Sequence, residues 1–321
     1  MSARMPDFYV AGAPKCGTTS LHAWLRGHSS AFLPELKEPH FHSTDLPGLA
    51  EVRTEAAYLA LFADASEGAL IGEASASYLH SDTAVPRILA ARPDARFIVI
   101  LRDPVEMAHA LHGEKLANLS EDVPDFETAW RLQEARAAGR NLPPRAREPR
   151  MLQYATVCAT GTQLERFVGR VPEAQRLVLL IDDMRADPDE LYARVLDFLG
   201  LERQTDASLD RANPSRQVRS RRLAELHRDL PRLIGPLYRP AKRLGNALGL
   251  SPSALVERLN VRRAPRASLD PAFEAELREV FRPEVARIEA ILGRDLSHWR
   301  KGGARRSEER RVGKECPSPC R

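Results

Sequence analysis

The sequence has no apolar stretch long enough to cross a membrane. No run of about 18 or more apolar residues occurs in its 321 residues, whereas a membrane-spanning helix needs about 20. The chain also reaches its first strand pattern without the apolar region of about 7 to 15 residues that marks a secretory signal. We therefore expect a protein with no membrane span and a cytoplasmic location.

Cysteine is scarce, with four residues in the whole chain. They are Cys16, Cys158, Cys316 and Cys320. The last two are separated by three residues and have no histidine pair nearby, which is not the spacing of a structural zinc site. Cys16 lies where a helix N-terminus lowers a thiol pKa, but we favour a small residue that fits a crowded turn. The cysteines give no indication of a metal centre.

An excess of one charge sign is missing from most of the chain. The formal net charge is +4, and residues 301–321 hold seven basic and three acidic residues, so the other 300 residues carry 41 of each sign. A nucleic-acid-binding domain carries a basic face, and this balance predicts none. Residues 301–321 also lack apolar periodicity. We expect them to be a disordered tail foreign to the fold, with a genuine basic tail as the alternative.

Strand and helix patterns alternate along the first 201 residues. The clearest strand covers residues 96–101, and its continuous apolar run indicates burial on both faces, as in a parallel sheet. Residues 177–181 form a second such run. The alternation predicts an α/β fold with an open, mostly parallel sheet and helices on both faces. Residues 202–300 lack strand patterns, and we expect them to add a helical part to a single domain of residues 1–300.

The most informative stretch is the turn between the first strand and the following helix. Residues 8–21 read Phe-Tyr-Val-Ala-Gly-Ala-Pro-Lys-Cys-Gly-Thr-Thr-Ser-Leu. Unpaired N–H groups and the helix dipole at such a turn favour an anion, usually a phosphate. The spacing of Gly12 and Gly17 is that of a nucleotide P-loop. However, the lysine stands inside the loop at Lys15, and Thr18 occupies the position of the usual P-loop lysine.

The segment from Pro14 to Leu21 resembles the 5′-phosphosulfate loop of sulfotransferases that use 3′-phosphoadenosine 5′-phosphosulfate (PAPS). This resemblance implies PAPS as donor, PAP as product and no metal. The loop residues that it places at the donor are Lys15, Cys16, Gly17, Thr18, Thr19 and Ser20. Lys15 would stabilise the negative charge that develops on the leaving oxygen during sulfonyl transfer.

A second segment, Arg102 to Ala110, resembles the 3′-phosphate segment of the same family. An arginine ends the strand there, and its planar fork suits a phosphate. The family has a serine eight residues later, where this chain has Ala110. The missing hydroxyl should cost about 1 kcal/mol of donor binding. Further along, Arg216 or Arg219 resembles a basic loop that returns to the donor, with an exposed basic helix start as the alternative.

The resemblance extends to the catalytic base. Residues 37–41 are similar to a Glu-x-His-Phe setting, which implies that Glu38 takes the proton from the acceptor. His40 is the second candidate, and a solvated loop carboxylate is the structural alternative. Glu73 is a second base, an acceptor ligand or a structural strand end. Ala74 stands where glycan-modifying members often carry lysine, which argues against a highly sulfated polysaccharide acceptor.

These patterns predict an enzyme that moves a sulfonate from PAPS to a hydroxyl or amine of a small-molecule or saccharide acceptor. A P-loop kinase or NTPase is one alternative. Residues 179–183 support it because a strand ending in aspartate resembles a magnesium site, and Thr18 opposes it because the P-loop lysine is absent. The second alternative is a non-catalytic relative that binds nucleotide without turnover, and Ala110 supports it. The sequence predicts neither the acceptor nor the oligomeric state.

Overall fold

Apolar strands that are buried on both faces form the centre of the fold. A computed structural model describes residues 4–203, 209, 216–218, 261–263 and 268–301. Its five-stranded sheet has the order β2-β3-β1-β4-β5, and every neighbouring pair is parallel. The strands are β1 (Phe8–Gly12), β2 (Ala31–Phe32), β3 (Leu70–Ala74), β4 (Arg96–Leu101) and β5 (Arg176–Leu180). The predicted α/β fold is confirmed, and this sheet is parallel throughout.

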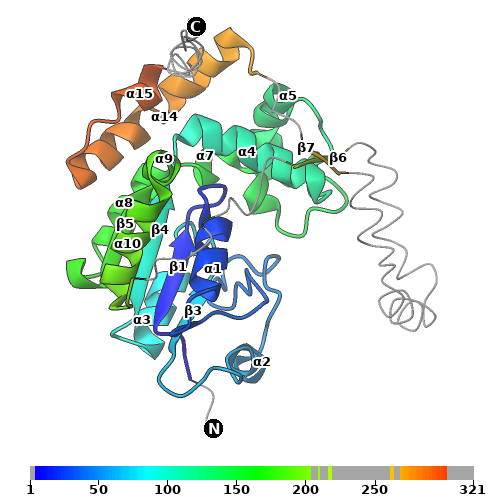
Figure 1. Ribbon diagram of the computed structural model, residues 1–321. Helices are drawn as coiled ribbons and strands as arrows, with labels where there is room; N and C mark the ends of the chain where they lie inside the picture. The colour runs from blue at the N-terminus through cyan, green and yellow to red at the C-terminus, as the bar shows by residue number, and fades with distance from the viewer. Residues whose placement is uncertain (1–3, 204–208, 210–215, 219–260, 264–267, 302–321) are drawn as a thin grey trace, which may run out of the picture.

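Helices lie around the sheet (Figure 1). Those of the described residues are α1 (Thr18–Arg26), α2 (Glu55–Ala60), α3 (Ala84–Ala91), α4 (Pro104–Ala117), α5 (Phe126–Arg131), α6 (Gln133–Ala137), α7 (Tyr154–Val157), α8 (Thr160–Val168), α9 (Ile181–Ala186), α10 (Pro188–Leu199), α14 (Pro271–Leu292) and α15 (Ser297–Lys301). Short 3₁₀ turns cover Pro149–Leu152 and Glu173–Gln175. No helix within these described ranges is both long and apolar enough to span a membrane.

The parallel arrangement explains the apolar run of β4. Every β4 residue after Arg96 is buried, and all five residues of β1 are buried as well. Because parallel strands end at the same edge of a sheet, the segments after β1, β4 and β5 lie together. Lys15, Arg102 and Asp182 belong to these segments. The sheet therefore brings Lys15 and Arg102, two of the predicted donor-binding residues, to one edge together with Asp182.

The C-terminal helices pack against the sheet region. Helix α14 contacts both α4 and α8. The carboxylate of Glu284, on α14, accepts hydrogen bonds from the Thr162 N–H at 2.7 Å and the Thr162 hydroxyl at 2.8 Å. Arg278 of α14 pairs with Asp103 at 2.8 Å. These contacts attach α14 to the starts of α8 and α4.

The predicted helical C-terminal part is confirmed by α14 and α15, and the described residues after 201 also contain a short strand pair that was not predicted. Strand β6 (Arg216–Val218) pairs antiparallel with β7 (Val261–Arg263). Each strand has three residues, which is too short for an alternating pattern to be recognised in the sequence. Residues 302–321, the predicted tail, lie outside the described residues.

Candidate functional site

The turn after β1 presents the N-terminus of α1. Gly17 has a φ of 92°, in the left-handed region, and a Cβ there would lie 2.7 Å from Met184 Sδ. Glycine is therefore required at this position. The Ser20 N–H donates to the Gly17 carbonyl at 3.0 Å. This N–H is therefore already bonded within the turn, unlike the anion-binding N–H group that was expected at Ser20. Thr18 and Thr19 stand in the first turn, where N–H groups have no acceptor within the helix, and both remain candidates.

The Cys16 side chain points into the core and away from the predicted donor position. It is completely buried, and its Sγ lies 3.3 Å from the Pro14 carbonyl oxygen and 4.0 Å from Met107 Sδ. Burial raises the pKa of Cys16 to about 12, so it is a neutral thiol at neutral pH. Its N–H donates to the Ala13 carbonyl. Neither its thiol nor its N–H is available to a donor in this conformation, which corrects the expectation for Cys16.

Lys15, inside the loop, forms an ion pair with α4. Its Nζ lies 2.7 Å from Glu114 Oε2, and both side chains are partly exposed. Burial opposes ionisation of Glu114, but Lys115 and Lys15 outweigh it and lower the pKa of this carboxyl. The ammonium of Lys15 is therefore held by an ionised carboxylate near the start of α1.

Arg102 directly follows β4 and contacts both α4 and the loop. Its Nη2 and Nε lie 2.6 and 3.0 Å from Glu106 Oε2, and its Nη1 donates to the Lys15 carbonyl at 3.1 Å. The backbone of Lys15 and the guanidinium of Arg102 are thus joined, which brings the two predicted ends of the donor site together. Ala110 lies between Glu106 and Glu114 on α4, four residues from each, and residues at this spacing share a helix face.

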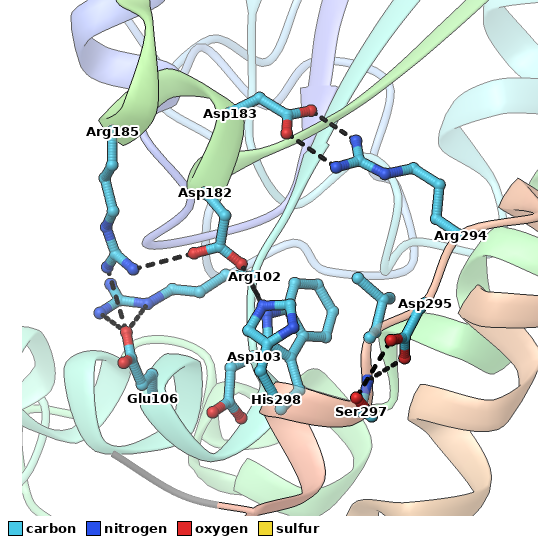
Figure 2. Close-up of polar contacts among 12 residues, drawn as sticks. Arg102, Asp103, Glu106, Asp182, Asp183, Arg185, Arg294, Asp295, Ser297 and His298 are labelled. Carbon is cyan, nitrogen blue, oxygen red and sulfur yellow. Dashed lines mark hydrogen bonds and ion pairs between the residues drawn. The ribbon is translucent and has the colours of Figure 1, made fainter. Parts of the chain in front are cut away.

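Arg185, in α9, reaches the same carboxylate oxygen as Arg102. Its Nη2 lies 3.1 Å from Glu106 Oε2, and its Nη1 lies 3.2 Å from Asp182 Oδ1. Figure 2 shows the two guanidinium groups converging on Glu106. Burial opposes ionisation of Glu106, but Arg102 and then Arg185 lower its pKa to about 2. The cluster therefore consists of two guanidinium groups around one ionised carboxylate.

Sequence reasoning missed three charged residues at this edge, Glu106, Glu114 and Arg185. A signal existed for Glu106, because it stands four residues after Arg102, the spacing at which charged side chains meet on a helix. No such signal exists for Arg185, which is separated from Glu106 by 79 positions.

Asp182 and Asp183, which gave the sequence its resemblance to a magnesium site, are paired with the C-terminal segment. Asp182 Oδ2 accepts from Trp299 Nε1 at 2.6 Å and lies 3.1 Å from His298 Nε2. Asp183 accepts from both terminal nitrogens of Arg294, at 2.6 and 2.9 Å (Figure 2). These contacts are typical of carboxylates that fasten one element to another. Within the described residues, no group of three or more His, Cys, Asp or Glu side chains is arranged to hold a metal ion.

Glu38 and His40 lie in contact in the loop after β2. His40 Nε2 lies 3.0 Å from Glu38 Oε2, which also accepts the Ala76 N–H at 2.9 Å, and Lys37 contacts the other oxygen. Burial opposes ionisation of Glu38, but Lys37 and the hydrogen bond from His40 outweigh it and hold the pKa of Glu38 well below its usual range. Glu38 is an ionised acceptor whose orientation is set by three neighbours.

The backbone of this loop is strained at the two candidate bases. Glu38 has a φ of 64° and His40 a φ of 51°. A left-handed conformation at a residue other than glycine costs about 1–3 kcal/mol. Such strain persists only where the surroundings hold it, and functional loops are a common place for it. The bend directs both side chains to the same point.

Glu73 is enclosed in the core at the end of β3. It is completely buried, and its Oε2 accepts hydrogen bonds from the hydroxyls of Tyr58 and Tyr78, each at 2.8 Å. Burial raises the pKa of Glu73, although hydrogen bonds from Ser75 and the two tyrosines act in the opposite direction. Of the three interpretations of Glu73, the geometry favours the structural strand end, because a fully buried carboxylate does not reach an acceptor in this conformation.

Two predicted residues of the late basic loop have no described side chain. Arg219 lies outside the described residues. Arg216 begins β6, and the structure describes its backbone pairing with Arg263. The contribution of either arginine to a donor site stays a prediction.

Comparison with known proteins places this chain in a family. Residues 5–218 match the family model of the sulfotransferase domain. Mouse heparan sulfate glucosamine 3-O-sulfotransferase 3A1 is 28% identical over 211 residues, covering 63% of this chain and 47% of that protein. Human carbohydrate sulfotransferase 15 is 33% identical over 148 residues, covering 33% of this chain and 26% of that protein. The matches thus span less than half the length of these curated relatives.

A solved structure supports the same assignment at the level of the fold. The sulfotransferase from Alicyclobacillus acidocaldarius superposes with a TM-score of 0.68 at 24% identity, covering 93% of this chain and 100% of that one. The family match itself includes the loop after β1, the loop of Glu38 and the start of α4. Because this match covers more than half of the chain, the protein belongs to the sulfotransferase domain family.

Proposed function

We propose that this protein transfers a sulfonate from PAPS to a hydroxyl or amine of an acceptor. The observation that carries the proposal is the pair of cations at one edge of the sheet. Lys15 stands at the start of α1, and Arg102 contacts the Lys15 backbone at 3.1 Å. Two linked cations suit a donor that carries a phosphosulfate at one end and a 3′-phosphate at the other.

The residues divide the work of transfer between leaving group and acceptor. The acceptor oxygen or nitrogen attacks sulfur, the bond from sulfur to the bridging oxygen breaks, and that oxygen departs on PAP. Lys15 neutralises the charge on the departing oxygen. Thr18 and Thr19 offer first-turn N–H groups to the 5′-phosphosulfate. Arg102 binds the 3′-phosphate through its planar fork.

Glu38 receives the acceptor proton in this proposal. A general base must lie within hydrogen-bond reach of that proton and be ionised. Glu38 is ionised, and His40 donates to it from Nε2 at 3.0 Å. His40 therefore acts as a positioning residue. In the alternative assignment His40 is the base, and a variant at each position separates the two.

The proposed acceptor class rests on the names of the relatives and on Ala74, a position at which this chain departs from the family pattern. The names of both curated relatives refer to carbohydrate or heparan sulfate substrates. We infer a saccharide or a small molecule with a free hydroxyl or amine. Ala74 is buried where glycan-modifying members often have lysine, which supports an acceptor of low negative charge. A cytoplasmic location, metal-independent transfer and a single domain over residues 1–300 complete the proposal.

Ligand-dependent melting tests the donor. The protein is heated alone, with PAP and with Mg-ATP, and PAP at about 100 times its Kd should stabilise it by about 2.7 kcal/mol. Stabilisation by Mg-ATP alone would overturn the proposal in favour of a kinase or NTPase. A second assay offers labelled PAPS with phenols, alcohols and sugars. PAP binding without any turnover in that panel would favour the non-catalytic relative.

Variants in one loop test the base. Glu38→Gln should lower kcat by at least about 100-fold, as expected on removal of a general base, with PAP affinity unchanged. Glu35→Gln is the matched control, because Glu35 is an exposed carboxylate of the same loop. If His40→Asn abolishes turnover and Glu38→Gln does not, the roles of the two residues are reversed.

A further inference from the structure

We propose that Arg185 is a second cation for the 3′-phosphate of the donor, and that Glu106 is an internal counter-ion which this phosphate displaces. The inference rests on the proposed PAPS donor and adds two residues to it. It accounts for a chain that lacks the family serine at Ala110 yet keeps Arg102.

The position of a bound anion is marked by Glu106 Oε2. That single oxygen lies 2.6 Å from Arg102 Nη2, 3.0 Å from Arg102 Nε and 3.1 Å from Arg185 Nη2. Three guanidinium donors from two elements thus converge on one carboxylate oxygen (Figure 2). A phosphate offers three oxygens and a greater charge, so it satisfies the same donors with more than one acceptor atom.

Arg185 is held in place before any donor arrives. Its Nη1 lies 3.2 Å from Asp182 Oδ1, and the other oxygen of Asp182 is bound by Trp299 and His298. Because the guanidinium is already oriented, less side-chain entropy is lost when Nη2 exchanges the carboxylate for a phosphate. Asp182 and α15 therefore act as positioning elements for Arg185.

The two arginines differ in solvent exposure, and this difference would allow a phosphate to replace the Glu106 carboxylate. The Arg102 side chain is 9% exposed, whereas those of Arg185 and Glu106 are 35% and 31% exposed. The cluster is thus closed on the side of Arg102 and open on the side of Arg185. Asp103, the other carboxylate at the start of α4, pairs with Arg278 of α14 at 2.8 Å.

The competing explanation is a purely structural ion cluster that fastens α9 to α4. The two explanations differ in their response to the 3′-phosphate alone. PAP and AMP share the adenosine and the 5′-phosphate, and only PAP carries the 3′-phosphate. A residue that binds this group changes PAP affinity without changing AMP affinity, whereas a structural residue changes both or neither.

The experiment measures PAP and AMP affinity by calorimetry on the full chain and its variants. Arg185→Gln should weaken PAP binding by about tenfold or more, as expected for a lost charged hydrogen bond, and leave AMP binding unchanged. Arg194→Gln is the matched control, since Arg194 pairs with Asp183 on the far side of α9 and should leave both affinities unchanged.

Glu106→Gln tests whether the 3′-phosphate displaces the Glu106 carboxylate, and its expected effect on PAP affinity is opposite to that of Arg185→Gln. Loss of the competing charge should strengthen PAP binding by about threefold or more with AMP affinity unchanged. A PAP preference over AMP that persists in Arg185→Gln, or a Glu106→Gln variant that binds PAP no better, overturns the inference and leaves the PAPS donor standing. A wild-type protein that binds PAP no better than AMP overturns the donor itself.

Discussion

At the scale of single residues, the two cations expected to meet the donor are each paired with a carboxylate from one face of α4. Lys15 pairs with Glu114 and Arg102 with Glu106. Ala110 lies between these carboxylates, four residues from each. Under the proposed function, donor binding exchanges two internal ion pairs for phosphate contacts, and the affinity for the donor depends on the side chains of this α4 face.

Restoring the family hydroxyl on this face should strengthen donor binding. Ala110→Ser adds a hydroxyl one helical turn after Glu106 on α4 and should raise PAP affinity about fivefold, since one added hydrogen bond contributes about 1 kcal/mol. Calorimetric titration with PAP measures the change, and titration with AMP is the control because AMP lacks the 3′-phosphate. Equal affinities for PAP in the variant and the wild type would refute this role of position 110.

The acidic limb of the pH profile should report on Glu38. Its pKa is held low by Lys37 and His40 against the effect of burial, and the base works only when ionised. Lys37→Met removes the neighbouring ammonium, so the pKa of Glu38 rises and the acidic limb of kcat/KM moves to higher pH. Steady-state rates across the acidic range measure the shift. A limb that stays in place would mean that Glu38 is not the titrating base.

Glu73 should make stability fall as the pH rises. Burial raises its pKa in the folded state, so the folded protein binds its proton more tightly than the unfolded chain, whose carboxyl has a pKa of about 4.3. The stabilisation is complete below that value and is lost as the pH rises through the folded pKa. Urea unfolding of wild type and Glu73→Gln across this range measures it. A constant difference between the two proteins would contradict the prediction.

At the scale of elements, α8 and α14 meet without space for a side chain. A Cβ at Gly161 would lie 2.3 Å from the carbonyl oxygen of Glu284, whereas one at Gly169 would meet its nearest neighbour at 3.5 Å. Both glycines belong to α8 or its C-terminal end. The two glycines form a matched pair, because only Gly161 lies in tight contact with the backbone of α14.

Alanine at these two positions should have opposite effects. Gly161→Ala forces the helices apart and should lower the free energy of unfolding by about 1–3 kcal/mol. Gly169→Ala meets only ordinary contacts and should leave stability unchanged or raise it by about 0.4–1 kcal/mol. Urea unfolding of the two variants gives both values. Equal effects would show that α14 does not pack here as described.

At the scale of the whole molecule, the C-terminal end of the described chain is fastened to the edge of the sheet that carries the candidate site. Asp103 pairs with Arg278, Asp183 with Arg294, and Asp182 with Trp299. Trp299 is buried. Helix α15 is thus part of the support of Arg185.

Two truncated proteins should distinguish the contribution of α15 from that of the tail, residues 302–321. A protein that ends after Lys301 should keep its melting temperature and its PAP affinity, because residues 302–321 have no apolar periodicity with which to form a core. A protein that ends after Leu296 loses α15 and the buried Trp299, so its melting temperature and PAP affinity should both fall. Thermal melts with and without PAP test both; a large effect of the first truncation would show that the tail is genuine.

The positions of several elements were predictable because they depend on neighbouring residues. The apolar run of β4 and the glycine turn after β1 are local patterns, and both were predicted. Between Phe126 and Ala137 the chain forms two short helices, α5 and α6, which meet at Leu132. The short pair β6 and β7 was not predicted, since a three-residue strand carries too little periodicity.

The sequence by itself determined the α/β fold, the glycine turn after β1 that contains Lys15, the position of Arg102 at the end of β4, and the family to which these segments point. These follow from spacing within single segments, which local chemistry sets. Only the tertiary structure decided that Cys16 and Glu73 are buried, and that Glu106 lies between Arg102 and Arg185. The physical reason is that burial and charge pairing depend on side chains brought together from distant segments, here from α4 and α9 across the end of one sheet.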